Sequence, residues 1–396
     1  MKELLLAIRR EFLTALHDPR RLVFLFGAAV AYLIVFGLLY VPNIVKDVPC
    51  VVYDAENSHF SRELVRDIES SDSMRAVLFV DSEEDMREAL RQKQAYAAIE
   101  IPADFSRKVK TGQSAEVLYM ANGANIILTN ITSSAMQDIL ADFSDRFAAE
   151  RTALRTGGDE ELLQHMISPV HAHLRVLYNT TQGYMFFFLL GLAMVAFQQG
   201  ILFAVGAAIC GEYEQLRAGE GDWQGPSWLL LVAKLVLYFA LAMLSYLLVV
   251  VLVQYVFAIP LKAPLGTLLG LAAAFIVAAM SFGIFASAIF PREMEFVRAI
   301  IMYPVPAFIL SGYTWPQESM PAWLQTVAEA FPLSWFSNTV RELFLAGHSP
   351  RLAGDYQAFA VLTAVFLSLG AMIFCWRMRR YRRAAAQAPE QTVESN

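Results

Sequence analysis

Long apolar runs constrain the fold of this chain more than any other feature. Residues 22–41 contain no charged side chain, and about 20 apolar residues are what a helix needs to cross roughly 30 Å of hydrocarbon. After a long interval, four more such runs follow at 184–209, 228–258, 265–290 and 357–376. The sequence therefore predicts a membrane α-helical protein.

A further segment, 298–315, is apolar but short, and it contains Pro304 and Pro306. Proline removes a backbone donor and kinks a helix, and broken helices at membrane depth need protein or water to satisfy the freed carbonyls. We expect this segment to be the fifth crossing in chain order, continued by a re-entrant segment at 312–335. The prediction is then six transmembrane helices within 22–41 and 184–376.

Clusters of basic residues predict the orientation of the bundle. Lys and Arg near the ends of spans stay on the cytoplasmic side, which predicts a multi-pass protein of the inner (plasma) membrane with both termini in the cytoplasm. Residues 42–183 then lie outside the cytoplasm. The first run is longer than a signal-peptide core, so we expect it to remain as an anchor. The basic residues flank the first and last runs: Lys2, Arg9, Arg10, Arg20 and Arg21 before the first, and Arg377, Arg379, Arg380, Arg382 and Arg383 after the last.

Residues 42–183 have the pattern of an inserted α/β domain. Strands are predicted at 50–56, 95–101 and 115–120, because apolar and β-branched residues gather there between turn signals. A helix to about residue 69 follows Asn57 and Ser58, whose short polar side chains can cap it. A second helix is predicted at 82–92, where Ser82 and Asp85 form a variant of the capping box. Strands alternating with helices favour a small sheet covered by helices.

A long helix is predicted at 124–156, with an apolar residue every four positions. Such a stripe needs a partner face. We favour packing on the sheet of the same domain. A stalk toward the second span, or a contact between two copies, is the alternative. The stripe consists of Ile127, Ile131, Ala135, Ile139, Phe143 and Phe147.

Motifs for catalysis are missing from the sequence. It has no Gly-x-x-x-x-Gly-Lys-Ser/Thr phosphate loop, no His-Glu-x-x-His pair and no Gly-x-Ser-x-Gly turn. His171 and His173 are two residues apart, with His165 nearby, and on a helix that spacing points their rings to different faces; we therefore expect solvated histidines and assign no metal site. Lys234 lies in an apolar run, where we expect its long side chain to reach the interface by snorkelling; a role in the transport path is the alternative. We therefore predict no enzyme, no catalytic or metal residues and no nucleic-acid partner.

The segment 304–335 reads PVPAFILSGYTWPQESMPAWLQTVAEAFPLSW. It resembles the signature of the membrane subunits of ABC-2-type exporters, in the subgroup with a large extracytoplasmic domain after the first span. The resemblance implies a permease without an ATPase site of its own. It also implies a homodimer or a heterodimer with a paralogous permease, partner ATP-binding subunits that carry ATP and Mg, and cooperation with a periplasmic adaptor protein. The matching residues are Leu310, Ser311, Gly312, Pro316, Met320, Pro321 and Pro332.

Two cytoplasmic segments also resemble that family. In it, the loop after the second span holds a Glu-rich coupling helix that docks on the ATPase; here this is 210–227, with Glu212, Tyr213 and Glu214 at its start. The rest of the loop, LRAGEGDWQGP, departs from the family pattern, and an ordinary acidic loop is the alternative. Residues 1–21 are amphipathic and resemble the family's interfacial elbow helix. Residues 377–396 form a basic cytoplasmic tail.

A candidate transport path follows from aromatic and polar residues in the second and fifth spans. A glutamine pair in mid-span costs free energy unless it finds partners or water, so hydrogen bonds between helices are the alternative to contact with cargo. The candidates are Phe186, Phe197, Gln198, Gln199, Tyr303, Phe308 and Ser311. In the fourth span, Gly266, Gly270, Ala274 and Ala278 form a small-residue face that we expect to pack on another span of the same chain.

The function predicted is the permease subunit of an ATP-driven exporter for a hydrophobic or amphipathic substrate, a drug-like compound or an envelope component. The first alternative is a non-transporting membrane scaffold or receptor whose extracytoplasmic domain binds a partner. A channel is a further alternative, for which the sequence contains no selectivity-filter ring. Co-purification of an ATPase separates the exporter from the scaffold.

Overall fold

The computed structural model describes residues 2–42, 44–111, 113–156, 178–179, 183–290 and 292–387. The chain divides into two compact units. The membrane unit comprises residues 1–43 and 176–396, and the sheet unit comprises residues 44–175. His165, His171 and His173 lie outside the described residues.

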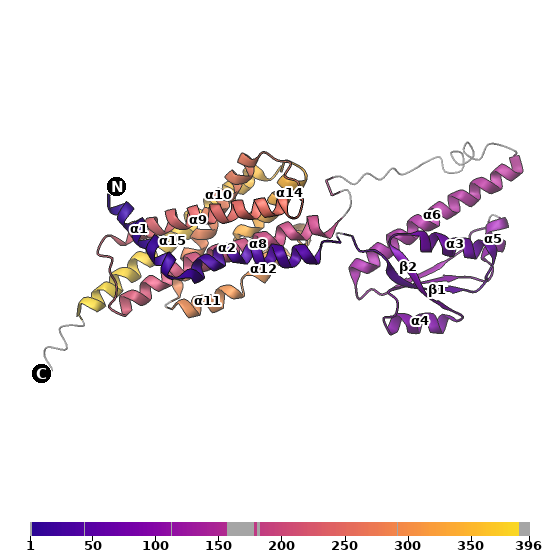
Figure 1. Ribbon diagram of the computed structural model, residues 1–396, viewed down its shortest axis with the longest axis horizontal. Coiled ribbons are helices and arrows are strands. Elements are labelled where there is room, and N and C mark those ends of the chain that lie inside the picture. Colours follow the sequence, from indigo (N-terminus) through magenta and orange to yellow (C-terminus); the bar gives the residue numbers. More distant parts are fainter. Residues whose placement is uncertain are drawn as a thin grey trace. The chain divides into compact units, whose positions relative to one another are not determined.

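The membrane unit is a bundle of helices (Figure 1). Five of them are long and apolar enough to cross a membrane, and they correspond to the five long runs in the sequence. In chain order the helices are α1 (Lys2–His17), α2 (Pro19–Leu39), α8 (Tyr184–Arg217), α9 (Ser227–Tyr255), α10 (Leu265–Ile289), α11 (Glu293–Ile301), α12 (Pro304–Leu310), the 3-10 turn η1 (Gln317–Ser319), α13 (Ala322–Glu329), α14 (Pro332–Leu345) and α15 (Leu352–Gln387). The five candidate spans are α2, α8, α9, α10 and α15.

The segment expected to be one further crossing is not a continuous helix. It contains the end of α11 and all of α12; these helices are 9 and 7 residues long and are separated by Met302 and Tyr303. Pro304 opens α12 and Pro306 follows within its first turn. Two prolines this close together remove two backbone donors, so the chain must restart its helix there. Both short helices pack against α8.

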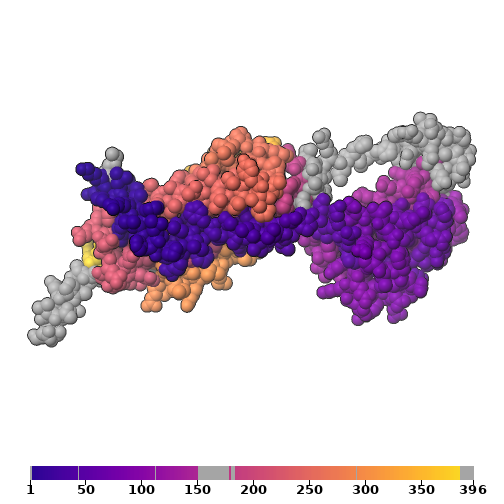
Figure 2. Space-filling view, in the orientation of Figure 1, coloured from indigo at the N-terminus to yellow at the C-terminus, as the bar shows by residue number. Residues whose placement is uncertain are grey.

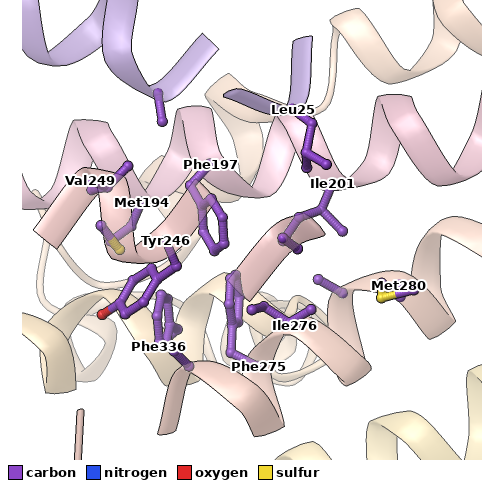
Figure 3. Close-up of a cluster of buried hydrophobic side chains, with 14 of the residues drawn as sticks. Leu25, Met194, Phe197, Ile201, Tyr246, Val249, Phe275, Ile276, Met280 and Phe336 are labelled. Carbon is purple, nitrogen blue, oxygen red and sulfur yellow. The ribbon is translucent and has the colours of Figure 1, made fainter. Parts of the chain in front are cut away.

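Helix α8 is the centre of the bundle, and most of its residues are buried. Phe197 and Ile201 of α8 point into a core shared with Tyr246 of α9, Phe275 of α10 and Phe336 of α14 (Figure 3). The rings of Phe275 and Phe336 stack with centroids 3.8 Å apart. Helix α2 lies on the outside of the bundle (Figure 2), and most of its surface is left for lipid.

Small residues allow the closest helix contacts. A Cβ at Gly200 of α8 would lie 2.7 Å from the backbone oxygen of Phe24, so α2 and α8 meet at the glycine itself. Gly270, from the small-residue face of α10, lies beside Tyr356 of α15. This glycine therefore packs on another helix of the same chain, as expected for that face.

The sheet unit contains four strands in the order β2-β1-β3-β4. Strands β1 (Val48–Asp54), β2 (Met74–Val80) and β3 (Ala97–Ile101) are parallel, and β4 (Leu118–Ala121) runs antiparallel to β3. Three of these strands agree with the predicted ones, whereas β2 falls outside the strands predicted from sequence. A bulge between Cys50 and Val51 interrupts the register of β1 with β2.

Helices cover both faces of the sheet. On one face, α3 (His59–Ser70), α5 (Phe105–Thr111) and α6 (Ile126–Thr156) pack over Cys50, Val52 and Ile99. On the other, α4 (Glu83–Arg91) packs over Val51 and Ala98. The predicted caps are present: the hydroxyl of Ser58 accepts from the Ser61 amide, and that of Ser82 accepts from the Asp85 amide.

The apolar stripe of α6 lies on the sheet of its own unit. Ala135, Ile139 and Phe147 border a core in which Phe143 is buried, and the rings of Phe143 and Phe147 lie 4.5 Å apart. This confirms the favoured reading for that part of the stripe. Ile127 is 41% exposed and lies outside the core.

Candidate functional site

One end of the membrane unit gathers α1, the loop after α8 and the C-terminal part of α15. The Arg10 Nε of α1 donates to Asp222 in the loop at 2.7 Å. From α15, Arg382 donates to the backbone oxygens of Trp223 and Gly225, each at 3.0 Å. Three segments far apart in the sequence therefore hold one another at this end, which we call the loop end.

A group of buried and partly buried charges lies at the loop end; we define the charge cluster as Arg10, Glu11, Arg21, Glu212 and Lys234. The two terminal nitrogens of Arg10 donate to the two carboxylate oxygens of Glu212, both at 3.1 Å. Lys234 Nζ lies 3.3 Å from Glu212 and 2.5 Å from Glu11. Arg21 Nη1 lies 3.8 Å from Glu11. The cluster thus joins α1, α2, α8 and α9 through alternating charges.

Lys234 corrects a prediction. Its side chain is 3% exposed and does not snorkel to an interface, because it donates to Glu11 of α1 and contacts Glu212 of α8. Taking an ammonium out of water costs several kcal/mol unless partners repay it. Two carboxylates from distant segments compensate for that cost here.

The amphipathic helix α1 turns a polar residue inward. Ala7, Glu11 and Ala15 form its buried face, which packs on α9. Several of its apolar residues point outward: Leu5 is 63% exposed and Leu16 is 51% exposed. An exposed apolar face together with an inward charge suits a helix that lies in a lipid interface and is tied to the bundle by ion pairs.

Hydrogen bonds shift the pKa values of two charged residues at the edge of the charge cluster, Arg10 and Asp222. The hydrogen bond from Arg10 holds the pKa of the Asp222 carboxyl below its usual value. Burial alone would lower the pKa of Arg10, but its hydrogen bonds to Asp222 and Glu212 outweigh burial and raise it. Arg10 therefore stays charged and bridges a buried carboxylate and one that is 66% exposed.

The three residues predicted to contact an ATPase have different surroundings. Glu212 is buried in the charge cluster, and Tyr213 is buried between the rings of Phe374 and Tyr381 of α15, 5.8 Å from each. Glu214 is exposed, and its carboxylate accepts from the Glu293 amide at 3.0 Å. A carboxylate at the first turn of α11 stabilises that helix start. Of the three, Glu214 is the one that is exposed to solvent.

Part of the candidate transport path forms one hydrogen-bonded group. Gln198 Nε2 donates to the Tyr303 hydroxyl at 2.8 Å, and Gln199 Nε2 donates to the Ile300 backbone oxygen at 2.9 Å. The two glutamines therefore attach α8 to the break between α11 and α12. Their carbonyl oxygens are buried and have no hydrogen-bond partner among the described residues.

The other candidates of that path lie apart. Phe197 faces the opposite side of α8, where its ring is 5.3 Å from that of Tyr246. Phe308 packs 5.5 Å from the Tyr313 ring, and Ser311 donates to the Phe308 backbone oxygen at 2.7 Å. Phe186 is partly buried at the border of the core. The structure therefore joins Gln198, Gln199 and Tyr303. It places Phe308 and Ser311 together at the end of α12, and Phe186 and Phe197 elsewhere on α8.

The signature segment is a chain reversal after α12. Gly312 has φ of +78°, a conformation that favours glycine. Around it, Asn338 Nδ2 donates to the Ser311 backbone oxygen at 3.0 Å, and Gln317 Nε2 donates to that of Leu310 at 3.1 Å. Leu310, Ser311 and Gly312 thus turn the chain from α12 back toward α14.

The remaining signature residues begin or end short elements. Pro316 precedes η1, Pro321 precedes α13, and Pro332 is in the first turn of α14. Met320 ends η1 and is buried with Leu310 and Ala328. Proline suits a helix start, because its missing donor would be unpaired there in any case. The pattern is therefore explained by the geometry of η1, α13 and α14.

The sequence model of the family described as "ABC-2 family transporter protein" matches residues 20–376. The chain is similar to a protein named "Probable multidrug ABC transporter permease YbhR" from Escherichia coli (strain K12), with 23% identity over 344 residues, which cover 85% of this chain and 88% of that protein. It is also similar to "Probable multidrug ABC transporter permease YbhS" from the same strain, with 27% identity over 146 residues, 37% of each chain. Because the family match spans the bundle, the sheet unit and the signature segment, this chain belongs to the ABC-2 family of transporter proteins, the membrane permeases of ABC transporters.

Proposed function

We propose that this chain is the permease subunit of an ATP-driven exporter in the inner membrane, and that its cargo is a hydrophobic or amphipathic compound. The multidrug label of the two relatives supports this cargo class. ATP and Mg belong to a partner ATP-binding subunit, since the chain lacks a phosphate loop. The permease pairs with itself or with a paralogous permease around a two-fold axis.

The proposed topology places both termini in the cytoplasm and the sheet unit outside it. Helices α11 and α12 together form a broken fifth crossing, which brings the total to six, and α13 and α14 form the re-entrant segment. The buried glutamine carbonyls at the break support a polar patch beside the path, where cargo or water supplies hydrogen bonds. A periplasmic adaptor protein is the expected partner of the sheet unit.

In the proposed mechanism, the charge cluster transmits motion from the ATPase to the helices of the membrane unit. A cytoplasmic ATPase pushes on the exposed part of the loop end, residues 214–226. Arg10 ties that loop to α1, Lys234 ties α8 to α9, and Arg382 ties the loop to α15. A load on the loop is then shared by four helices rather than absorbed by one flexible segment. In this proposal Glu214 contributes to docking, while Glu212 and Tyr213 transmit the motion within the chain.

Affinity purification of the tagged chain in mild detergent, with mass spectrometry of partners and an ATPase assay, tests this function. Glu214→Ala should lose the ATPase and lower the melting temperature of the permease only slightly, because the one hydrogen bond that it removes, to the start of α11, is exposed. Glu212→Gln should lower the melting temperature. Glu318→Ala is the matched control, because Glu318 is 73% exposed and distant from the loop end.

The outcomes separate the alternatives. Recovery of no ATPase under several detergents would contradict the exporter and favour the scaffold or receptor. Recovery of an ATPase that tolerates Glu214→Ala would keep the exporter and move the docking site elsewhere on the loop end.

A further inference from the structure

A second polar site lies at the opposite end of the membrane unit, where α8 begins and α14 ends. A cavity of about 430 Å³ opens there, lined by Tyr178, Phe187, Arg341, Glu342 and His348 among others. Binding pockets for small molecules are commonly about 300–1,000 Å³. The cavity is therefore large enough for a small ligand or a lipid headgroup.

Arg341 is held firmly at the wall of this cavity. Its guanidinium lies over the rings of Phe187 and Tyr313, 4.8 and 4.4 Å from their centroids. Nη2 donates to Asn338 Oδ1 at 2.9 Å, and Asn338 in turn donates to the turn at Ser311. The two ring centroids are only 5.4 Å apart, so both rings lie on the same side of the guanidinium. The side chain is thus held by aromatic contacts on one side and by a hydrogen bond along one edge before any ligand arrives.

Two charged atoms in this wall are buried without a partner. Arg341 Nη1 and Glu342 Oε2 have no hydrogen bond among the described residues. They do not pair with each other, since neighbouring residues on a helix point in different directions. Buried charged groups are normally hydrogen-bonded, and leaving one unpaired is costly. One unpaired donor and one unpaired acceptor in residues that line the same cavity point to a ligand that forms a hydrogen bond with each of them.

We propose that the cavity binds a zwitterion that carries an anionic phosphate or carboxylate group and a primary ammonium. The anionic group accepts from Arg341 Nη1, and the ammonium donates to Glu342 Oε2. A quaternary ammonium does not satisfy Glu342, because it has no N–H to donate. A ligand with a single charge leaves one of the two residues unpaired, so the site selects against it.

Two sources can supply this chemistry: the headgroup of an ethanolamine phospholipid, or a free zwitterion such as phosphoethanolamine. The full-length chain in nanodiscs of phosphatidylcholine is titrated separately with short-chain phosphatidylethanolamine, short-chain phosphatidylglycerol and soluble phosphoethanolamine, and bound ligand is counted by native mass spectrometry. The expected result is tighter binding of the ethanolamine lipid than of the glycerol lipid. Binding of soluble phosphoethanolamine as tight as that of the lipid would assign the site to a free ligand.

Charge-neutralising variants separate recognition from structure. Glu342→Gln should weaken ethanolamine binding about tenfold and should not weaken phosphatidylglycerol binding, so that the preference for the ethanolamine lipid falls. Arg341→Gln should weaken both lipids. If Arg341→Gln does not fold, Arg341→Lys replaces it, because Lys keeps the charge and loses the planar fork. The exposed pair Arg351 and Glu318, 3.4 Å apart, supplies the control, and Glu318→Gln should change neither affinity.

The proposal is overturned if the wild-type chain does not distinguish the two lipids, or if Glu342→Gln weakens both equally. It does not depend on an ATPase partner or on transport. A failure here therefore leaves the proposed exporter untouched, and a failure of the exporter leaves this site to be judged by binding alone.

Discussion

Removing the ammonium from the charge cluster is the sharpest perturbation that the structure offers. Lys234→Met keeps the length and most of the apolar stem of the side chain and deletes the charge. Glu212 keeps its two hydrogen bonds from Arg10, at 3.1 Å each. Glu11 loses its 2.5 Å partner and, among the described residues, keeps one cation, Arg21 at 3.8 Å, and a contact with the Tyr238 hydroxyl. The substitution therefore leaves one carboxylate, that of Glu11, poorly compensated in a place where its side chain is 0% exposed.

The expected cost follows from that geometry. Breaking a buried ion pair by removing one partner destabilises proteins by about 3–5 kcal/mol. For a unit of this size, each kcal/mol lowers the melting temperature by about 2–4 °C, so a drop of roughly 6–20 °C is expected. Replacing both members, Glu11→Gln with Lys234→Met, removes the orphan charge and should restore most of the loss.

The assay is the melting temperature of the purified full-length chain in detergent, measured for the wild type, both single variants and the double variant. A double-mutant cycle isolates the pair from the separate effects of each change. A Lys234→Met variant as stable as the wild type would refute the reasoning. So would a double variant that is no more stable than Lys234→Met alone, because the loss would then come from packing rather than from charge.

Gly312→Ala should destabilise the chain by about 1–2 kcal/mol, because Gly312 has φ of +78°. Gly266→Ala is the control and should not lower the melting temperature in this way, because a Cβ there meets nothing within 4 Å. The melting temperatures of the two variants test this prediction. Gly200→Ala places a Cβ 2.7 Å from a backbone oxygen of α2 and should lower the free energy of unfolding by about 1–3 kcal/mol through overpacking. The melting temperature should fall, and an unchanged melting temperature would show that α2 shifts freely. Burial alone would raise the pKa of Glu56, but hydrogen bonds from Ser106 outweigh burial and lower it. The stability from this contact is therefore complete above the ordinary pKa of Glu56 and is lost as pH falls through the lowered value; hydrogen exchange of residues 105–111, corrected for intrinsic rates, should quicken on acidification in the wild type and not in Glu56→Gln.

Local signals in the sequence predict much of the fold. The five long helices follow from run length and the scarcity of charge, and α3 and α4 follow from Ser58 and Ser82, which do cap them. Strand β2 could also have been predicted from the sequence, since MRAVLFV contains the β-branched and aromatic residues typical of a strand. The break between α11 and α12 is signalled by Pro304, although proline alone does not tell a kinked crossing from two separate helices.

The predicted site was less complete. Glu212 and Tyr213 belong to the right segment, but the sequence does not reveal that both are buried, because a helix that ends at an acidic loop looks the same whichever side faces out. Gln198 and Tyr303 were both predicted as candidates, and the structure adds the 2.8 Å bond that joins them. Arg341 and Glu342 were not singled out, since an adjacent Arg and Glu on a short helix is an ordinary pattern.

The sequence by itself determined which segments are long apolar helices, where a separate α/β unit is inserted, and where the chain reverses after α12. These features depend on composition and spacing within a few turns of chain, which local physics decides. Only the tertiary structure decided which buried charges meet. Lys234 and Glu11 are 223 residues apart, and each is costly alone inside the bundle. Their partners must therefore come from distant segments, and no local pattern records that pairing.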